Sequence, residues 1–432
     1  MAPSKRPTPR QNAGASSGTY LLSLTVENIR CFGPAQTLDL SDGHGGHAPW
    51  TIILGENGLG KTTLLTCLAC IAAEGDVDRK YHRDWVAARI GLVRGSGDAM
   101  GRIHATVVSS EEPRRTGEAD IAVVKGRMNH SSDAIAWQML SFNYGASRRM
   151  PQRQGLVADN GRIGVVLDDD VALRDPEDWL LTADYNVRIG GVEARRFEVF
   201  AKRVRDALIE FLPEVNEVRI QAAEEPGGSP RVEARTPDGW VPLRQLGFGY
   251  QSEIAWVVDL ASRMFERYPD SPDPLAEPAV VLVDEIDLHM HPRWQRQIIA
   301  FLAQRFPRTQ FIVTAHSPLI VQAAGGANIA LLRREGDHVV IDNDPVVLRN
   351  WRVDQILTSE LFGLESARPP QIEEPLKERR ALLAKPTLTA RDRKRLGELE
   401  QNIGDLPAGE SAEDRRAMEL IRQAAAKLSG DA

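Results

Sequence analysis

The sequence feature that most limits the possible fold of this chain is a glycine-rich loop between an apolar run and a helix-forming stretch. The run Ile52 to Leu54 leads into Gly55-Glu56-Asn57-Gly58-Leu59-Gly60-Lys61-Thr62-Thr63, and the stretch from Leu64 to Ala73 follows. This is the pattern G-x-x-x-x-G-K-[ST] in its strand–loop–helix context. The glycines let successive backbone N–H groups surround a phosphate, and the helix N-terminus adds partial positive charge. The pattern therefore predicts a phosphate-binding loop between a buried strand and a helix.

Side chains of this loop have separate expected tasks. We expect Lys61 to reach the β- and γ-phosphates of a nucleotide and Thr62 to ligate Mg²⁺. The other loop residues expected to contact the nucleotide are Asn57, Gly58, Gly60 and Thr63. The motif therefore predicts ATP and Mg²⁺ as cofactors.

The overall charge limits the kinds of partner. The chain has 432 residues, a length that suits two or three domains, and a formal net charge of −7. An acidic chain is not a basic nucleic-acid binder over its whole surface, although a single face can still be basic. The arginine-rich helical stretch 195–205 is one such face, and a solvated surface and a DNA-binding surface both stay open for it.

The sequence predicts a cytoplasmic protein that is not embedded in a membrane. No stretch reaches the roughly 18 apolar residues that cross a bilayer, and the N-terminus has no apolar signal-peptide core. The cysteines are Cys31, Cys67 and Cys70, and so few in a long chain are typical of a reducing compartment. We interpret Cys67 and Cys70 as small core residues of the helix after the loop, because no metal-binding or redox partners are recognisable.

The chain is predicted to have three parts. Residues 1–18 are rich in Pro, Ser, Gly and basic residues, which predicts a disordered arm. Residues 19–348 alternate between strand and helix patterns and include a helical insertion at 175–215. Residues 349–432 are rich in charged residues, Ala and Leu, which predicts a helical tail. Docking of a partner or second copy and packing on its own domain are both open for this tail.

Two continuous apolar strands indicate the kind of sheet. They are Ala279 to Val283 and Gln310 to Thr314, and a helix is expected between them at about 293–305. Strand–helix–strand order with continuous apolar runs in both strands predicts a parallel sheet that is covered on both faces.

Two carboxylates follow the first of these strands. Asp284 and Glu285 come directly after Val280-Val281-Leu282-Val283, so the strand delivers both acids to the carboxyl edge of the sheet, where open α/β folds bind ligands. Asp284 suits a Mg²⁺ ligand, and Glu285 suits the base that orients the attacking water. The pair therefore predicts the catalytic edge of a nucleotide hydrolase.

A histidine follows the second strand. His316 lies one strand beyond the acid pair, where it suits a sensor that hydrogen-bonds the γ-phosphate. For His289 and His291 a cap or core position is as good an interpretation as a functional one. Their i, i+2 spacing does not favour a shared metal site.

Four segments carry a resemblance to a known family. They are Leu24–Phe32, Gly55–Thr63, Asp284–Pro292 and Thr314–Pro318. The chain resembles the ABC-type ATPases of the SMC and RecF-like branch, within the AAA-family ATPases. Within that branch it looks most like the stand-alone ATPases of bacterial anti-phage systems, such as the Septu ATPase.

The resemblance implies a fold, an assembly and partners. The fold would be α/β, a P-loop NTPase of ABC/SMC-head type, with a mixed β-sheet, flanking helices, a helical insertion and a C-terminal helical tail. Two copies would form a head-to-tail homodimer, with ATP between the phosphate loop of one subunit and the signature loop of the other. Arg30, Gly249 and Ser252 are further residues that the resemblance assigns to nucleotide contact. A separate nuclease effector and DNA are the other partners implied.

The signature region, 240–265, departs from the family pattern. Its candidate loop is Leu246–Ser252, placed just before a helix expected at Gln251–Phe265, and Gly247 stands where the family usually has serine. Glycine supplies a backbone N–H group but no hydroxyl for the γ-phosphate. This departure puts ATP hydrolysis in doubt, but not ATP binding. Ser252 is a candidate to supply the missing hydroxyl. The family's glutamine before the signature has the candidates Gln138, Gln152 and Gln154, with Arg148 as a substitute.

Three functions follow as hypotheses. The first is a Mg²⁺-dependent ATPase that dimerises around ATP and controls a separate effector, a nuclease, in anti-phage defence. The second is a DNA-repair or chromosome-maintenance ATPase that acts on DNA directly. The third is a nucleotide-gated scaffold that does not hydrolyse ATP. The segment 331–347 reads as a hairpin around Glu335-Gly336-Asp337, so we expect no nuclease activity in this chain.

Overall fold

The computed structural model describes residues 17–72, 100–111, 113–124, 127–148, 150, 173–212, 214–223, 228–345, 351–364, 366–385 and 387–403. The chain divides into two compact units, Met1–Phe362 and Gly363–Ala432. Most of the arm predicted at 1–18 lies outside the described residues. The domain boundary predicted at 349 stays a prediction.

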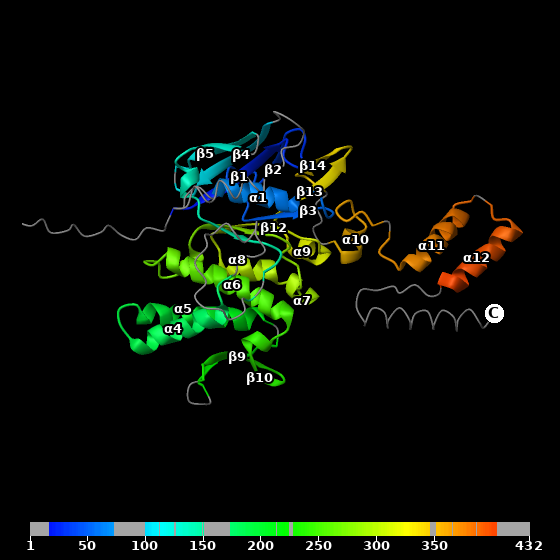
Figure 1. Cartoon of the computed structure of the whole chain (residues 1–432). Coiled ribbons are helices and arrows are strands. Elements are labelled where there is room, and N and C mark those ends of the chain that lie inside the picture. The colour runs from blue at the N-terminus through cyan, green and yellow to red at the C-terminus, as the bar shows by residue number, and fades with distance from the viewer. Residues whose placement is uncertain are drawn as a thin grey trace, which may run out of the picture. The chain divides into compact units, whose positions relative to one another are not determined.

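A six-stranded sheet lies in the middle of the first unit (Figure 1). Its order is β14-β13-β3-β12-β11-β7, and its strands are β3 (Trp50–Leu54), β7 (Ser141–Tyr144), β11 (Ala279–Val283), β12 (Thr309–Thr314), β13 (Asn328–Glu335) and β14 (His338–Asp342). Strands β7, β11, β12, β3 and β13 are parallel, and β14 returns antiparallel to β13. The predicted parallel strands and the hairpin at residues 335–337 are confirmed.

The alternation of side chains along β11 explains why this sheet is buried on both faces. Val280 and Leu282 pack into one apolar cluster, whereas Val281 and Val283 pack into another on the opposite face. Successive side chains of a strand point to opposite faces, so a strand covered on both sides favours apolar residues at successive positions. The run of apolar residues before Asp284 is therefore the signature of a central strand.

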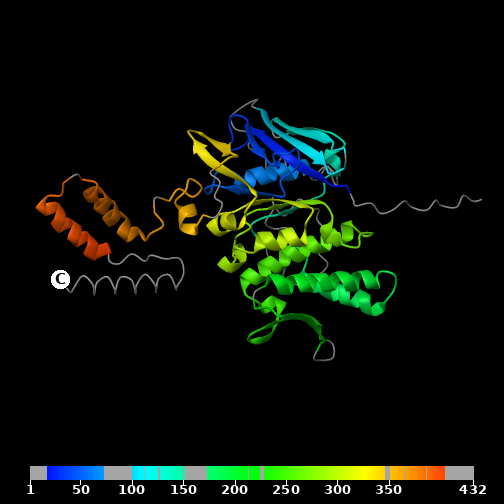
Figure 2. The same ribbon diagram turned by 180° about the vertical axis from the view of Figure 1, so that it is seen from behind.

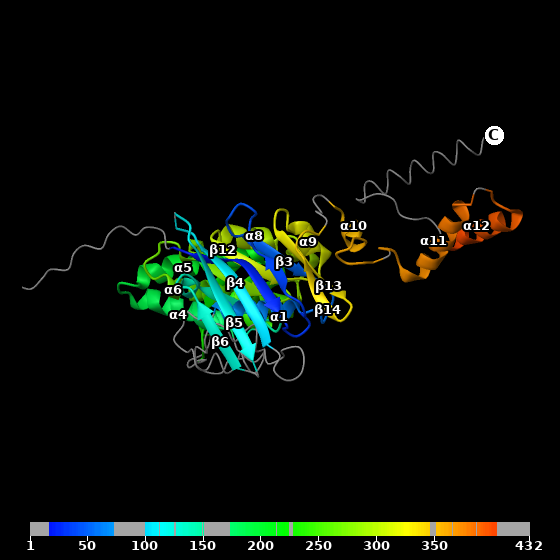
Figure 3. The ribbon, with the colours of Figure 1, turned by 90° about the horizontal axis from the view of Figure 1, so that it is seen from above.

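A second, antiparallel sheet of five strands covers one face. Its order is β2-β1-β4-β5-β6, and its strands are β1 (Thr19–Glu27), β2 (Gln36–Asp39), β4 (Met100–Ser109), β5 (Thr116–Val124) and β6 (Arg127–Ser132). Helix α1 (Lys61–Ala72) lies between the two sheets (Figure 1), and β4 and β5 run side by side above it (Figure 3). Cys67 and Cys70 are fully buried in this layer, in keeping with their interpretation as core residues.

Helices cover the other face of the parallel sheet (Figure 2). They are α6 (Phe248–Arg267), α7 (Pro292–Gln295), α8 (Ile298–Arg305) and α9 (Pro318–Ala323), with α4 (Pro176–Ile189) and α5 (Ala194–Phe211) packed outside α6. Short 3-10 turns occur at Ala136–Gln138, Leu243–Gln245 and Pro274–Ala276. The helix expected at 293–305 is two helices, because the chain breaks at Arg296 and Gln297 before α8 begins.

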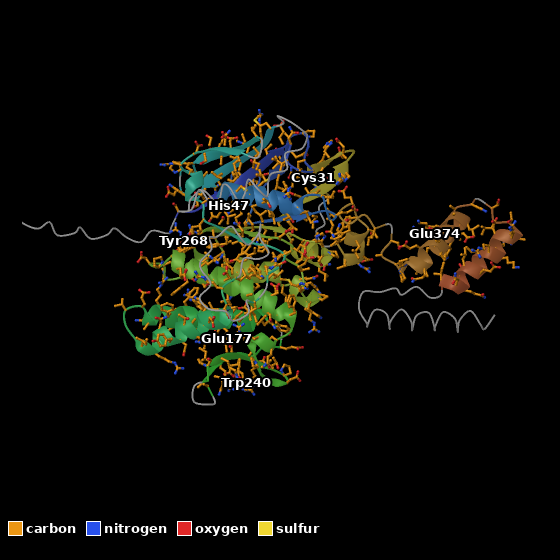
Figure 4. The ribbon with its side chains drawn as sticks, in the orientation of Figure 1. Cys31, His47, Glu177, Trp240, Tyr268 and Glu374 are labelled. Carbon is orange, nitrogen blue, oxygen red and sulfur yellow. The ribbon has the colours of Figure 1, made fainter. Side chains whose placement is uncertain are left out.

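The helical insertion is α4 and α5, and a three-stranded sheet extends beyond it. That sheet has the order β10-β9-β8, with β8 (Glu217–Gln221), β9 (Arg231–Thr236) and β10 (Gly239–Pro242). Glu177 on α4, labelled in Figure 4, accepts a hydrogen bond from the backbone N–H of Val232 at 2.9 Å and another from Arg244 Nε at 2.6 Å. This buried carboxylate therefore ties the insertion to the small sheet.

The basic face of α5 is partly engaged within the molecule. Arg196 donates to the carbonyl oxygen of Phe265 and stacks on its ring, with 3.7 Å between Cζ and the ring centroid. Arg203 forms an ion pair with Asp273 at 2.5 Å. These two arginines hold α5 against the rest of the unit, which weakens the DNA-binding interpretation of this face.

The second unit contains two helices that pack on each other, α11 (Pro370–Leu383) and α12 (Ala390–Ile403). Leu376, Leu382 and Leu399 are its buried side chains. Thr389 and Asp392 form a capping box at the start of α12: the backbone N–H of Asp392 donates to Thr389 Oγ1 at 3.2 Å, and that of Thr389 donates to the Asp392 carboxylate at 3.0 Å. A short helix, α10 (Val353–Leu357), belongs to the first unit.

Across the described residues, no helix is both long enough and apolar enough to cross a membrane.

Candidate nucleotide-binding and hydrolysis site

The phosphate loop connects β3 to α1 as the motif predicts. Gly58 and Gly60 have φ angles of +81° and +91°, a region that L side chains rarely adopt. A Cβ atom on Gly60 would lie 2.4 Å from Cys31 Sγ and 2.9 Å from Phe32 Cε2, whereas one on Gly58 would meet nothing within 4 Å. The loop therefore needs glycine at position 60 for both conformation and space.

Lys61 is folded back into the loop. Its ammonium group donates to the carbonyl oxygens of Gly55 at 2.7 Å and Glu56 at 3.0 Å. Burial lowers the pKa of Lys61, and the nearby Asp284, Glu285 and Asp287 carboxylates oppose that shift. The cation is thus held at the loop by groups that a phosphate can replace.

The loop hydroxyl and the acid pair meet directly. Thr62 Oγ1 donates to Asp284 Oδ2 at 2.6 Å, although the two residues lie 222 positions apart. Thr314, at the end of β12, donates to the other Asp284 oxygen at 2.6 Å. The same Thr314 oxygen accepts the backbone N–H of Glu285 at 2.7 Å, so one hydroxyl orients both acids.

Glu285 has an uncommon backbone conformation. Its φ angle is +48°, in the left-handed region that non-glycine residues adopt at a cost of about 1–3 kcal/mol. Its side chain is 34% exposed, and Oε1 lies 4.0 Å from Nε2 of His316. The predicted base and the predicted sensor are therefore neighbours at the open edge of the sheet.

Asp287 organises the turn behind this edge. Its carboxylate accepts the backbone N–H of His316 at 3.0 and 3.2 Å. His291 is a helix cap, because its Nδ1 accepts the backbone N–H of Arg293 at 3.2 Å. The ring of His289 packs edge-on against Phe248, with centroids 4.8 Å apart. The structure thus gives His289 and His291 packing and capping contacts.

The signature region differs from the expectation at its boundary. Helix α6 begins at Phe248, so Gly249 and Ser252 lie in its first two turns rather than in a preceding loop. Gly247 is the N-cap and provides no side-chain hydrogen bond. A Cβ on Gly249 would lie 2.6 Å from the carbonyl oxygen of His289, which explains glycine there by close packing.

Ser252 does not reach the phosphate loop in this subunit. Its side chain is 2% exposed, and its hydroxyl donates to the carbonyl oxygen of Arg148 at 2.7 Å. The Ser252 hydroxyl is thus engaged within its own subunit, and its contact with a nucleotide on the opposite subunit stays a prediction.

The remaining predicted residues are placed as follows. Arg30 has a φ angle of +49° and is exposed next to Cys31, whose thiol contacts the loop carbonyl of Leu59 at 3.4 Å. Asn57 is exposed on the loop, and Thr63 is buried in α1. Gln138 is exposed, whereas Gln152 and Gln154 lie outside the described residues.

Arg148 has a position that the sequence did not indicate. It is 2% exposed, and its guanidinium donates to the carbonyl oxygens of Asp284 and of Glu285, the latter at 2.9 Å. It therefore holds the backbone of the acid pair from the inside and does not face the loop as a substitute for glutamine. No local pattern reveals this role, because the contacts span 136 and 137 residues of sequence.

Glu253, on α6 behind Arg148, is a fully buried acid. Burial raises its pKa from an ordinary value of 4.5 to about 7, against the opposing effects of Arg148 and of the Trp256 indole, which donates to its carboxylate at 2.7 Å. The folded protein then holds a proton that the unfolded chain releases, so this group's contribution to stability declines as pH rises from 4.5 to about 7.

We expect Glu253→Gln to remove this pH dependence. The contribution lost across that window is on the order of 3 kcal/mol for the wild type. Urea unfolding at a series of pH values would give the free energy of unfolding of the wild type and of the variant. The difference between the two isolates the contribution of Glu253, because the contributions of the other titrating groups cancel. A difference that is independent of pH would mean that the pKa of Glu253 is the same in the folded and unfolded states.

The oxygen atoms at this edge fit Mg²⁺. Thr62 is exposed, and its hydroxyl contacts one oxygen of the Asp284 carboxylate. Thr314 contacts the other Asp284 oxygen. Hydroxyl and carboxylate oxygens are the kind of ligand that Mg²⁺ prefers. Thr62 and Asp284 are the residues that would hold the ion. Elsewhere in the described part of the chain, no group of three or more His, Cys, Asp or Glu side chains is arranged to bind a metal.

Two protein-family models match separate parts of the chain. A family model described as "AAA domain, putative AbiEii toxin, Type IV TA system" matches residues 159–322, and a second, described as "AAA domain", matches residues 23–101. Over these two stretches the chain is therefore similar to AAA domains.

The particular proteins that it resembles include the Septu protein PtuA of Bacillus mycoides (strain KBAB4), with 26% identity over 376 residues, 85% of this chain and 48% of that protein. It also resembles the Retron Ec83 probable ATPase of Escherichia coli, with 37% identity over 132 residues, 30% of this chain and 23% of that protein. The chain thus spans less than half the length of these two relatives. Among solved structures, an Smc head domain with an extended coiled coil, bound to the C-terminal domain of ScpA and derived from Pyrococcus furiosus, matches with a TM-score of 0.46 and 12% identity over 75% of this chain and 96% of that one.

Proposed function

We propose that this chain binds ATP with Mg²⁺ at the loop of residues 55–63 and hydrolyses it. The observation that carries this proposal is the hydrogen bond of 2.6 Å between Thr62 Oγ1 and Asp284 Oδ2, which joins the loop to the acid pair. Glycine N–H groups and Lys61 would bind the phosphates, and Glu285 would accept the proton of the attacking water. Bound Mg²⁺ would neutralise charge on the β- and γ-phosphates.

The test is phosphate release by the purified full chain. We expect turnover with ATP and Mg²⁺ and its loss when EDTA removes the metal. The same assay with double-stranded DNA addresses the repair hypothesis, because stimulation that weakens steeply with salt is typical of direct DNA binding. ATP that binds but is not hydrolysed would contradict the proposed activity.

We further propose that two copies form a head-to-tail dimer around ATP and control a separate effector, a nuclease, in anti-phage defence. The names of the Septu and retron relatives support the defence role. Lys61→Ala should abolish protection in phage plating assays, in which cells that express the wild type are the reference. Equal protection by both would count against ATP-controlled defence.

A nucleotide-gated scaffold is the second candidate. Gly247 favours it, because this N-cap of α6 has no hydroxyl for a γ-phosphate of the opposite subunit. Under this hypothesis ATP produces the dimer without turnover, and light scattering with ATP and with a non-hydrolysable analogue should give the same mass over time.

A further inference from the structure

We propose that Arg148 is a positioning residue that keeps the acid pair in its working conformation and ties it to helix α6. The guanidinium donates to the carbonyl oxygens of Gly145, Asp284 and Glu285. These contacts fix the backbone on both sides of the peptide bond between the two acids. The proposal rests on the proposed function, since it concerns the same metal ligand and the same base.

The strained backbone at Glu285 explains why such a support is needed. A non-glycine residue at a φ angle of +48° persists only when its surroundings hold it there. Thr314 holds the N–H of Glu285 at 2.7 Å, and Arg148 holds its carbonyl oxygen at 2.9 Å. Thr314 lies at the end of β12 and Arg148 lies in the segment after β7, so the backbone conformation of Glu285 depends on two separate parts of the chain.

Arg148 is also connected to the helix that begins at the signature region. Its own carbonyl oxygen accepts the Ser252 hydroxyl at 2.7 Å, and its guanidinium is near the carboxyl group of the buried Glu253. Its Nε atom and Oε1 of Glu253 are buried without a hydrogen-bond partner. A buried polar group without a partner is costly, so the other hydrogen bonds of Arg148 must offset that cost. A displacement of α6 would therefore reach Glu285 through one side chain.

The chemistry of the side chain makes the proposal specific. Arginine presents several N–H donors in a planar fork, whereas lysine offers a single ammonium group at the end of a flexible stem. Lysine at position 148 would retain the charge and lose the simultaneous bonds to two successive carbonyl oxygens. Arg148→Lys is therefore the sharpest variant, and Arg148→Ala is the complete deletion.

Arg196 provides a matched control. Its guanidinium also donates to a backbone carbonyl, that of Phe265, and its Nε is likewise buried without a partner, but it lies on α5, away from the acid pair. Arg196→Lys thus removes the same kind of contact elsewhere in the unit.

The experiment uses the full chain and three measurements. A fluorescent ATP analogue gives nucleotide affinity in EDTA, electron paramagnetic resonance gives Mn²⁺ affinity in the presence of nucleotide, and phosphate release gives kcat at saturating ATP. For Arg148→Lys we expect unchanged nucleotide affinity in EDTA, Mn²⁺ affinity lower by about 10-fold, and kcat lower by about 100-fold. In Arg148→Ala, millimolar guanidinium should restore part of the turnover, whereas methylammonium should not. Arg196→Lys should match the wild type.

Several results would overturn the proposal. Wild-type Mn²⁺ affinity and turnover in Arg148→Lys would exclude a positioning role. A loss of nucleotide affinity in EDTA would mean that Arg148 contacts the nucleotide, and equal losses in Arg196→Lys would mean general destabilisation. If the wild type binds ATP without hydrolysing it, the proposed function fails, and Mn²⁺ affinity alone decides the role of Arg148. If Arg148→Ala does not fold, the lysine variant decides.

Discussion

Glu285→Gln is expected to lower ATP turnover by about 100- to 10,000-fold and to leave nucleotide affinity unchanged. Glutamine has the same shape and the same cost at a φ angle of +48°, but its amide cannot accept the proton of the attacking water. Phosphate release and equilibrium binding of ATP measure the two effects separately. Glu266→Gln, at an exposed acid on α6 that pairs with Arg174, is the control.

The same variant separates the two proposed functions. A hydrolysing enzyme without its base should accumulate an ATP-bound dimer, which size-exclusion chromatography with light scattering detects. A scaffold that never hydrolyses should behave as the wild type does. Turnover close to that of the wild type would remove Glu285 from the catalytic role.

Gly60→Ala is expected to abolish ATP binding and to destabilise the fold. An alanine Cβ would have to occupy space within 2.4 Å of Cys31 Sγ and 2.9 Å of the buried Phe32 ring, at a φ angle of +91°. The strained backbone alone costs about 1–3 kcal/mol, and the collision moves the loop that carries Lys61 and Thr62. Binding of a fluorescent ATP analogue and urea unfolding would measure the two losses.

Gly58→Ala is the matched control for this prediction. Its φ angle is +81°, but its Cβ would meet nothing within 4 Å. It therefore introduces a similar backbone cost without the collision, and should retain more ATP affinity than Gly60→Ala does. Equal affinities in the two variants would show that space around position 60 is unimportant.

Features with a local cause were predictable from the sequence. The phosphate loop and the acid pair each combine a buried strand with the residues that follow it, so short patterns identify them. The parallel sheet was predictable because Ala279 to Val283 is apolar at every position, a pattern that is typical of a strand covered on both faces. The insertion at 175–215 was predictable because its apolar residues follow the period of a helix.

Features with a distant cause were not predictable in the same way. The start of α6 was misplaced because Gly247 caps the helix without a polar side chain, and such a cap leaves no sequence signal. Arg148 was a candidate substitute for the family's glutamine, whereas its guanidinium donates to the carbonyl oxygens of Gly145, Asp284 and Glu285. Backbone acceptors are the same in every residue, so no sequence pattern records them.

The burial of α1 has a mechanical consequence. From Thr63 to Ile71 every residue of this helix is buried between two sheets, and a closely packed interior resists deformation. The phosphate loop is therefore attached to a rigid helix, and nucleotide binding should cost little conformational entropy in this part of the chain. We therefore expect nucleotide-dependent movements outside α1, in α6 and in the insertion formed by α4 and α5.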